Sequence, residues 1–241
     1  MATQPHLLVD DGDLTDIALI PGDPGRVDRI ADHCDESETI AQNREYKVVN
    51  ATYEGRELTI CSTGIGCPSA AIAIEELANV GVETFIRVGT TGALQSGIEI
   101  GDMIVATGAA KNEGTSKRYE APEYPAVPDY DVLSALADAA EANDEDVHVG
   151  PIASDDATTP RPTRPSTTGR PPACSPSRWR PPPSSRWPAA RACAPVRSVP
   201  STGTSSKGQK GTATEDDELP EKAKNNVGRA IDLSLEAATH L

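Results

Sequence analysis

The stretch from Thr84 to Gln95 constrains the fold more than any other part of the chain. It begins as an apolar run, Thr-Phe-Ile-Arg-Val, and such a run predicts a buried strand. It ends in Gly-Thr-Thr-Gly at 89–92, which predicts a turn with exposed N–H groups and two hydroxyls. Because a buried guanidinium is costly alone, Arg87 needs either an internal carboxylate or an anionic ligand. Open α/β sheets bind ligands at the carboxyl ends of their strands, where this turn lies.

Two further glycine-containing turns follow short apolar strands. The predicted strand 17–20 precedes Pro-Gly-Asp-Pro-Gly-Arg at 21–26 and then a helix over 27–31. The predicted strand 57–61 precedes Ser-Thr-Gly-Ile-Gly at 62–66, after which Pro68 suits the first turn of a helix. A glycine turn between a strand and a helix presents N–H groups to an anion, although an ordinary connection has the same composition.

Strands and helices alternate along the first two thirds of the chain. We expect an α/β fold in which helices surround one mixed sheet, in a single domain over residues 1–241. The remaining predicted elements are a hairpin of 46–53 with 57–61, strands at 102–107 and 148–153, and helices at 131–142 and over 223–238.

The chain is strongly acidic, with a formal net charge of −15. This charge argues against nucleic acid or an anionic membrane as a partner, and it fits a halophilic source. No apolar run reaches membrane-spanning length, and no signal peptide opens the chain. The five cysteines are scattered without a zinc spacing. They predict reduced thiols in a cytoplasmic protein without a bound metal.

The composition changes abruptly over residues 158–206. This segment contains eight arginines and no acidic residue, so the remainder of the chain carries −23. It holds both tryptophans and more than half of the prolines, but no Leu, Ile, Phe or Tyr. One interpretation is a disordered Pro/Arg-rich insert that binds partners. The interpretation we favour is a frameshift, which leaves an aberrant, disordered segment and a C-terminal core that is partly lost.

Codon degeneracy supports the frameshift. Codons for 176–187 can be chosen so that the neighbouring frame encodes Ser-Val-Glu-Met-Glu-Ala-Ala-Ala-Val-Phe-Ala-Leu, an amphipathic helix. The same shift over 195–208 allows Gly-Ala-Val-Cys-Thr-Val-Asp-Gly-Asn-Leu-Val-Glu-Gly-Thr, a buried strand and a loop. The gene's nucleotide sequence around codons 157 and 208 decides between the two interpretations.

Five motifs stand out along the first 157 residues. They are Pro-Gly-Asp-Pro-x-Arg at 21–26, Ser-Thr-Gly-Ile-Gly at 62–66, Arg-Val-Gly-Thr-Thr-Gly at 87–92, Tyr-Pro-Ala-Val at 124–127 and His-Val-Gly at 148–150. The motifs occur in the order found in nucleoside phosphorylases of the uridine phosphorylase type, which the chain resembles over roughly residues 6 to 157. Cys67 departs from the pattern, because the family usually has a glycine there. The out-of-frame Glu-Met-Glu also resembles a family motif.

The resemblance implies phosphorolysis of a ribonucleoside, with uridine favoured, to a free base and ribose 1-phosphate. It implies no cofactor, because inorganic phosphate is a co-substrate. Arg44 and His6 would act in the site of a neighbouring subunit, so the resemblance implies a homo-oligomer built from dimers, with hexamers common. The catalytic group is unknown. The implied phosphate-binding residues are Gly22, Arg26, Arg44, Arg87 and Thr90, and the implied nucleoside-binding residues are His6, Thr91 and Gly92.

Two alternatives remain open at this stage. The first is a purine nucleoside phosphorylase, because the out-of-frame Thr-Val-Asp-Gly-Asn resembles the aspartate loop on the purine side of such enzymes. The stretch before the out-of-frame Glu-Met-Glu is also short for the residues that hold uracil. The second is an inactive nucleoside- or phosphate-binding protein that engages partners through its Pro/Arg tract. As written, the chain lacks the ribose-binding Glu-Met-Glu, so we expect impaired activity.

Overall fold

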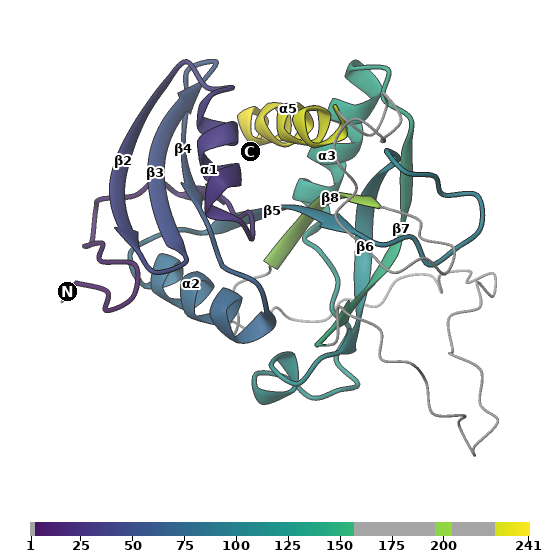
Figure 1. The fold of residues 1–241 in the computed structure, drawn as a ribbon, viewed down its shortest axis with the longest axis horizontal. Helices are drawn as coiled ribbons and strands as arrows, with labels where there is room; N and C mark the ends of the chain where they lie inside the picture. Colours follow the sequence, from purple (N-terminus) through teal and green to yellow (C-terminus); the bar gives the residue numbers. More distant parts are fainter. Residues whose placement is uncertain (1–2, 157–195, 204–224) are drawn as a thin grey trace.

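The computed structural model describes residues 3–156, 196–203 and 225–241. Strands and helices alternate through this part of the chain, as the sequence predicts (Figure 1). The elements are β1 (Ile17–Leu19), α1 (Pro24–Ala31), β2 (Glu36–Asn43), β3 (Tyr46–Tyr53), β4 (Arg56–Cys61), α2 (Cys67–Asn79), β5 (Thr84–Thr91), β6 (Met103–Asn112), η1 (Ser116–Arg118), α3 (Tyr130–Ala142), β7 (Val147–Asp155), β8 (Val196–Gly203) and α5 (Asn226–Thr239).

The main sheet is mixed. Within the described residues its strand order is β2-β3-β4-β1-β5-β8. The strands β4, β1, β5 and β8 run parallel, whereas β2 and β3 form antiparallel pairs that lead into β4. Strands β6 and β7 pair in parallel as a second sheet, and β6 also contacts β8. This arrangement confirms the predicted α/β class with a mixed sheet and surrounding helices.

Both faces of the central strands are covered, which explains their nearly continuous apolar sequences. Ile17 and Leu19 of β1 pack on one face with residues of α1, α3 and α5. Ala18 packs on the opposite face with residues of α2 and the N-terminal segment. Figure 1 shows α1 and α5 on one side of the sheet and α2 on the other. The carboxyl ends of β1, β4 and β5 therefore meet at one edge of a rigid layer.

The structure departs from the sequence predictions at the end of β5 and at β2. The Gly-Thr-Thr-Gly sequence is not a turn through Thr91, because β5 continues to that residue. Its extension pairs with β8, where Gly89 lies opposite Ser201 and Thr91 opposite Gly203. Strand β2 gave no sequence signal, because it is an edge strand whose first four residues are exposed and whose composition is polar.

Part of the compositionally aberrant segment is regular. Residues 196–203 form β8, although the frameshift interpretation expects disorder over 158–206. Two residues of β8, at 199 and 200, lie opposite the single residue Val88 between the paired positions Arg87–Ser198 and Gly89–Ser201, so the ladder contains an irregularity there. This irregularity accommodates Pro200, because bulges tolerate a residue that cannot donate to the ladder. Residues 158–195 and 204–206 lie outside the described residues.

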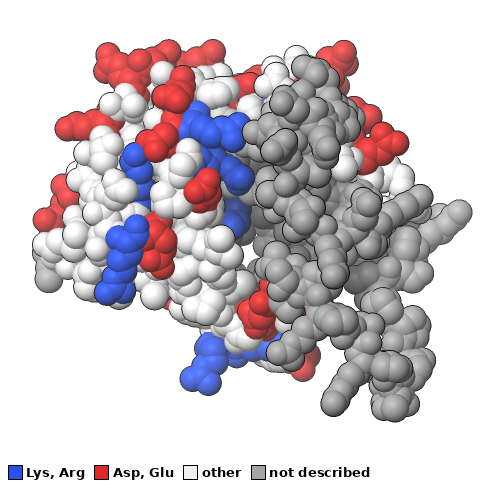
Figure 2. All heavy atoms as spheres, viewed as in Figure 1, with Lys and Arg blue, Asp and Glu red and all other residues white. Residues whose placement is uncertain are grey.

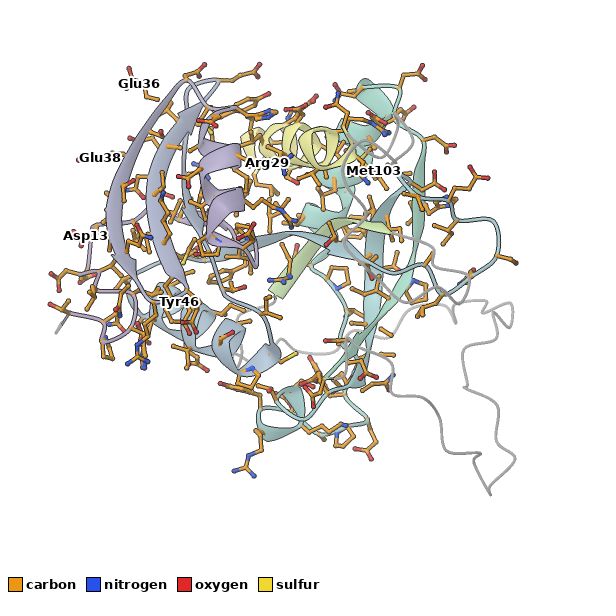
Figure 3. The ribbon with its side chains drawn as sticks, in the orientation of Figure 1. Asp13, Arg29, Glu36, Glu38, Tyr46 and Met103 are labelled. Carbon is orange, nitrogen blue, oxygen red and sulfur yellow. The ribbon has the colours of Figure 1, made fainter. Side chains whose placement is uncertain are left out.

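Acidic side chains dominate the rim of the molecule. Figure 2 shows Asp and Glu gathered along the outer edges, while a group of basic side chains lies nearer the middle of the same face. Figure 3 places Asp13, Glu36 and Glu38 along the outer edge beside β2, and all three are exposed. Among the described helices, none is long and apolar enough to cross a membrane.

Candidate active site

Three chain segments meet where β1, β4 and β5 end. Because these strands are parallel neighbours, the residues that follow them come to the same edge of the sheet. The backbone N–H of Thr63 donates to the carbonyl of Pro21 at 2.9 Å. The N–H of Ile20 donates to the carbonyl of Ile86 at 2.8 Å. The two glycine-containing turns are thus fastened to each other and to the arginine-bearing strand.

Arg87 reaches across these turns from inside the sheet. Its Nη1 donates to the hydroxyl of Thr63 at 3.0 Å and lies 3.5 Å from the carbonyl of Ile20. A Cβ atom added to Gly22 would lie 3.3 Å from Nη2 of Arg87. The guanidinium therefore lies directly beside the backbone of the first turn.

A second guanidinium, that of Arg26, approaches from the first half of α1. Helix α1 begins at Pro24 because the side chain of Asp23 caps it, accepting from the N–H of Gly25 at 3.1 Å. Nη1 of Arg26 donates to the carbonyl of Val88 at 3.2 Å. Its Nε is buried and has no hydrogen-bond partner among the described residues. A buried donor without a protein partner is open to a water molecule or to an anion.

The electrostatics of the pair favour an anion. Burial lowers the pKa of Arg87 from its ordinary value, and the Arg26 guanidinium lowers it further. Burial also lowers the pKa of Arg26, against the opposing effect of Asp23. Within the described part of the chain, no carboxylate forms an ion pair with Arg87. The carboxylate partner considered for Arg87 is therefore absent there, and two neighbouring cations at one sheet edge are suited to an anion.

The remaining predicted phosphate residues lie at the same edge. Thr90 is exposed near the end of β5. Arg44 is exposed in the turn between β2 and β3, in the left-handed region with φ 54°. The next residue, Glu45, accepts from the hydroxyl of Ser62, so this turn adjoins the end of β4. Strands β3 and β4 lie between β2 and β1 in the sheet, and within the described residues no hydrogen bond links Arg44 to Arg26 or Arg87.

The predicted nucleoside residues divide into two groups. Thr91 and Gly92 lie at the end of β5, close to the phosphate residues in sequence. His6 lies apart, against helix α2, where its ring Nδ1 is 2.5 Å from Oε1 of Glu76. His6 lines a surface groove between α2 and the segment around η1, and neither Arg26 nor Arg87 lines that groove.

Three contributors to this region were given no role in the site from the sequence. Thr63 lies in a recognised motif, but its hydrogen bond to Arg87 has no sequence signature. Glu76 is a buried carboxylate on a helix whose spacing suggests only packing. The thiol of Cys67 lies 3.6 Å from the hydroxyl of Ser154 at the end of β7. Among the described residues, no cluster of three or more His, Cys, Asp or Glu could hold a metal ion.

The structure defines an α/β protein in which two arginines, Arg26 and Arg87, lie at the carboxyl ends of parallel strands. Residues 16–165 match the family model of the phosphorylase superfamily. A guanosine phosphorylase from Halorubrum lacusprofundi is 59% identical over 244 aligned residues that span 100% of both chains. The chain therefore belongs to the phosphorylase superfamily, and its relatives are nucleoside phosphorylases, which are pentosyltransferases.

Other relatives match only part of the chain. A uridine phosphorylase from Thermococcus kodakarensis is 52% identical over 153 residues, which cover 64% of this chain and 55% of that protein.

The crystal structure of a purine nucleoside phosphorylase from Toxoplasma gondii superposes with a TM-score of 0.74 over 99% of this chain and 96% of that one. At 23% identity, that likeness establishes the fold alone.

Gly22 offers a direct test of the anion site. An alanine Cβ there would lie 3.3 Å from both Nη2 of Arg87 and the carbonyl of Gly64, in the space where the turn meets the guanidinium. We expect Gly22→Ala to raise the Kd for inorganic phosphate about tenfold, the scale of one charge-assisted hydrogen bond. Titration calorimetry measures this change. Gly150→Ala is the matched control, because its Cβ would meet nothing within 4 Å. An unchanged Kd in Gly22→Ala would place the phosphate elsewhere.

Proposed function

We propose that this protein is a nucleoside phosphorylase that acts in the cytoplasm. Phosphate attacks the anomeric carbon of a ribonucleoside, the glycosidic bond breaks, and ribose 1-phosphate and the free base leave. The observation that carries the proposal is the pair Arg26 and Arg87, which meet at one sheet edge without a carboxylate between them among the described residues. Membership of the phosphorylase superfamily supports the same reaction.

The residues at this edge act by positioning and by charge. The transition state of such a displacement resembles an oxocarbenium ion, so the nucleophile must be held against the ribose face without being neutralised by protonation. Arg26, Arg87 and the backbone of Gly22 supply donors to the phosphate oxygens, and Thr90 adds a hydroxyl. Preorganised donors of this kind contribute most of the catalysis when no covalent intermediate is formed.

The favoured substrate is a purine ribonucleoside, with guanosine as the first to test. The relative that spans the whole chain is named a guanosine phosphorylase. The uridine phosphorylase of T. kodakarensis matches over 153 residues, a length that leaves out about a third of this chain. The out-of-frame Asp-Gly-Asn also suits a purine, because a carboxylate accepts a hydrogen bond from a protonated ring nitrogen. Uridine remains the second candidate, since five motifs of the first 157 residues resemble the uridine enzymes.

The proposed site is shared between subunits. Among the described residues, no hydrogen bond links His6 or Arg44 to Arg26 or Arg87, and both are at least partly exposed. In the proposed dimer, Arg44 of one subunit contacts the phosphate in the site of its neighbour, and His6 contacts the ribose 5′-hydroxyl there. Such pairs could assemble further into hexamers.

The test is phosphate-dependent release of free base, followed by chromatography with guanosine and uridine as separate substrates. The assay compares the chain as written with a frame-restored chain in which 158–206 are translated in the neighbouring frame. We expect release only when phosphate is present, and faster release by the frame-restored chain. Failure of both chains to release either base would overturn the proposed function. Omission of phosphate is the control in each case.

A binding protein without catalysis is the candidate from another class. The composition of residues 158–206, with eight arginines and no acid, is the observation that favours it. In that case the chain as written would bind phosphate or nucleoside in calorimetry without releasing base, and frame restoration would add no activity.

A further inference from the structure

One buried carboxylate holds the N-terminal segment in place. Glu76 of α2 is only 6% exposed, although it carries a charge. Its Oε2 accepts from the backbone N–H of His6 at 3.0 Å and from that of Leu7 at 2.8 Å. Its Oε1 lies 2.5 Å from the ring Nδ1 of His6. The same carboxylate therefore fixes both the backbone and the ring of His6.

We propose that Glu76 is a positioning residue that sets which ring nitrogen of His6 carries the proton. A carboxylate can only accept, so Nδ1 of His6 must donate. In the neutral imidazole this leaves Nε2 with a lone pair that accepts from a hydroxyl. The inference rests on the proposed function, in which His6 contacts the ribose 5′-hydroxyl of the nucleoside, and that hydroxyl is a donor.

The surroundings suit this role. The His6 side chain is 37% exposed, whereas that of Glu76 is 8% exposed, so the carboxylate lies inside and the imidazole at the surface. The two backbone N–H groups hold Oε2 at the same time as Oε1 faces the ring, so the carboxylate cannot rotate without losing bonds. The His6 ring lines the groove between α2 and the η1 segment, whose other walls include Pro68, Ala71, Ile72 and Tyr119. Nε2 of His6 has no hydrogen-bond partner among the described residues.

A purely structural tie between α2 and the N-terminal segment makes a different prediction. If Glu76 is only such a tie, its hydrogen bonds to His6 and Leu7 are needed, but the position of the proton on the His6 ring has no effect. Replacing Glu76 by glutamine separates the two roles, because the amide oxygen still accepts from both backbone N–H groups. The amide NH₂ would instead donate to Nδ1 of His6, which moves the ring proton to Nε2.

The first experiment measures the tautomer directly by nitrogen-15 NMR of the four histidines in the full chain, above the pH range in which an ordinary histidine titrates. We expect His6 to carry its proton on Nδ1 in the unsubstituted chain and on Nε2 in Glu76→Gln. Glu75→Gln is the matched control on the neighbouring, exposed position of α2, and we expect it to keep the original tautomer. A proton on Nε2 of His6 in the unsubstituted chain would overturn the proposal without any variant.

The second experiment measures kcat/KM for a nucleoside and for its 5′-deoxy analogue, with the form of the chain that turns over nucleoside. We expect the unsubstituted protein and Glu75→Gln to prefer the hydroxylated substrate by about three- to tenfold, the range of one hydrogen bond between neutral groups. Glu76→Gln should weaken this preference, because a protonated Nε2 can no longer accept and the hydroxyl must turn to accept from it instead, while activity on the 5′-deoxy analogue changes little. Full retention of the preference in Glu76→Gln would refute the positioning role. If no form of the chain cleaves any nucleoside, the proposed function fails, and the NMR result still decides how His6 is protonated.

Discussion

Arg87→Ala is expected to reduce kcat/KM for phosphate by the equivalent of about 2–4 kcal/mol of transition-state stabilisation. The reason is that Arg87 supplies a charge from inside the sheet, between the hydroxyl of Thr63 and the backbone of Gly22. Water that fills the space left by the side chain would stabilise the phosphate less than a preorganised guanidinium does. Because the arginine lies on the phosphate side, nucleoside binding should change far less. Steady-state kinetics with each substrate varied in turn, on the frame-restored chain, measure both effects.

Arg56→Ala is the matched control for this variant. Arg56 begins β4 at the opposite edge of the same sheet, and its Nη2 lies 3.1 Å from both carboxylate oxygens of Asp16. Its removal deletes a guanidinium and an ion pair without touching the anion site. We therefore expect an effect on stability but none on the KM for phosphate. Phosphorolysis by Arg87→Ala within about a factor of two of the unsubstituted protein would contradict the assignment of Arg87.

Removal of salt is expected to dissociate the frame-restored protein and to abolish most of its activity. Outside residues 158–206 the chain carries −23, and acidic residues such as Glu36 and Glu38 are exposed along β2. At low ionic strength these carboxylates repel one another, whereas in molar salt the screening length falls to about 3 Å. If His6 and Arg44 act in a neighbouring subunit, dissociation removes part of each site. Both the oligomer and the activity should return in concentrated potassium chloride.

Sedimentation and phosphorolysis across a salt series test this expectation together. The double variant Glu36→Gln/Glu38→Gln should shift both midpoints to lower salt, because it removes two charges from one exposed strand. Loss of activity that precedes dissociation would indicate that salt acts within a subunit. Full activity as a monomer in dilute buffer would contradict both the salt requirement and the shared site.

The sequence predicted that Arg87 and the two glycine-containing turns come together, because the signals are local, while an anion as their ligand stays a prediction. An arginine within an apolar strand and glycines directly after two neighbouring strands are visible in the residues, and parallel topology brings them together. The hydrogen bond between Arg87 and Thr63 could not be predicted, since it depends on how far the Arg87 side chain reaches from β5 past β1 to the turn after β4. The extension of β5 to Thr91 depends on β8, whose composition gives no sign of a buried strand.

The role of Glu76 was invisible for a different reason. Glutamate in an amphipathic helix ordinarily faces solvent, and the partners of Glu76 lie 69 and 70 residues earlier in the chain. Only the folded structure shows that the Glu76 carboxylate is buried and accepts hydrogen bonds from the N-terminal segment. Strand β2 escaped prediction because an exposed edge strand needs no alternating apolar pattern to pair with β3.

Strand β5, which carries Arg87, pairs with β8, which lies within the compositionally aberrant segment 158–206. If β8 did not form, the arginine-bearing strand would become an edge, and its unpaired N–H and C=O groups would be open to other chains. A change within 158–206 that prevented β8 from forming would therefore do more than alter the residues near the base. It would also leave the strand that carries Arg87 as an unpaired edge, which is a template for aggregation.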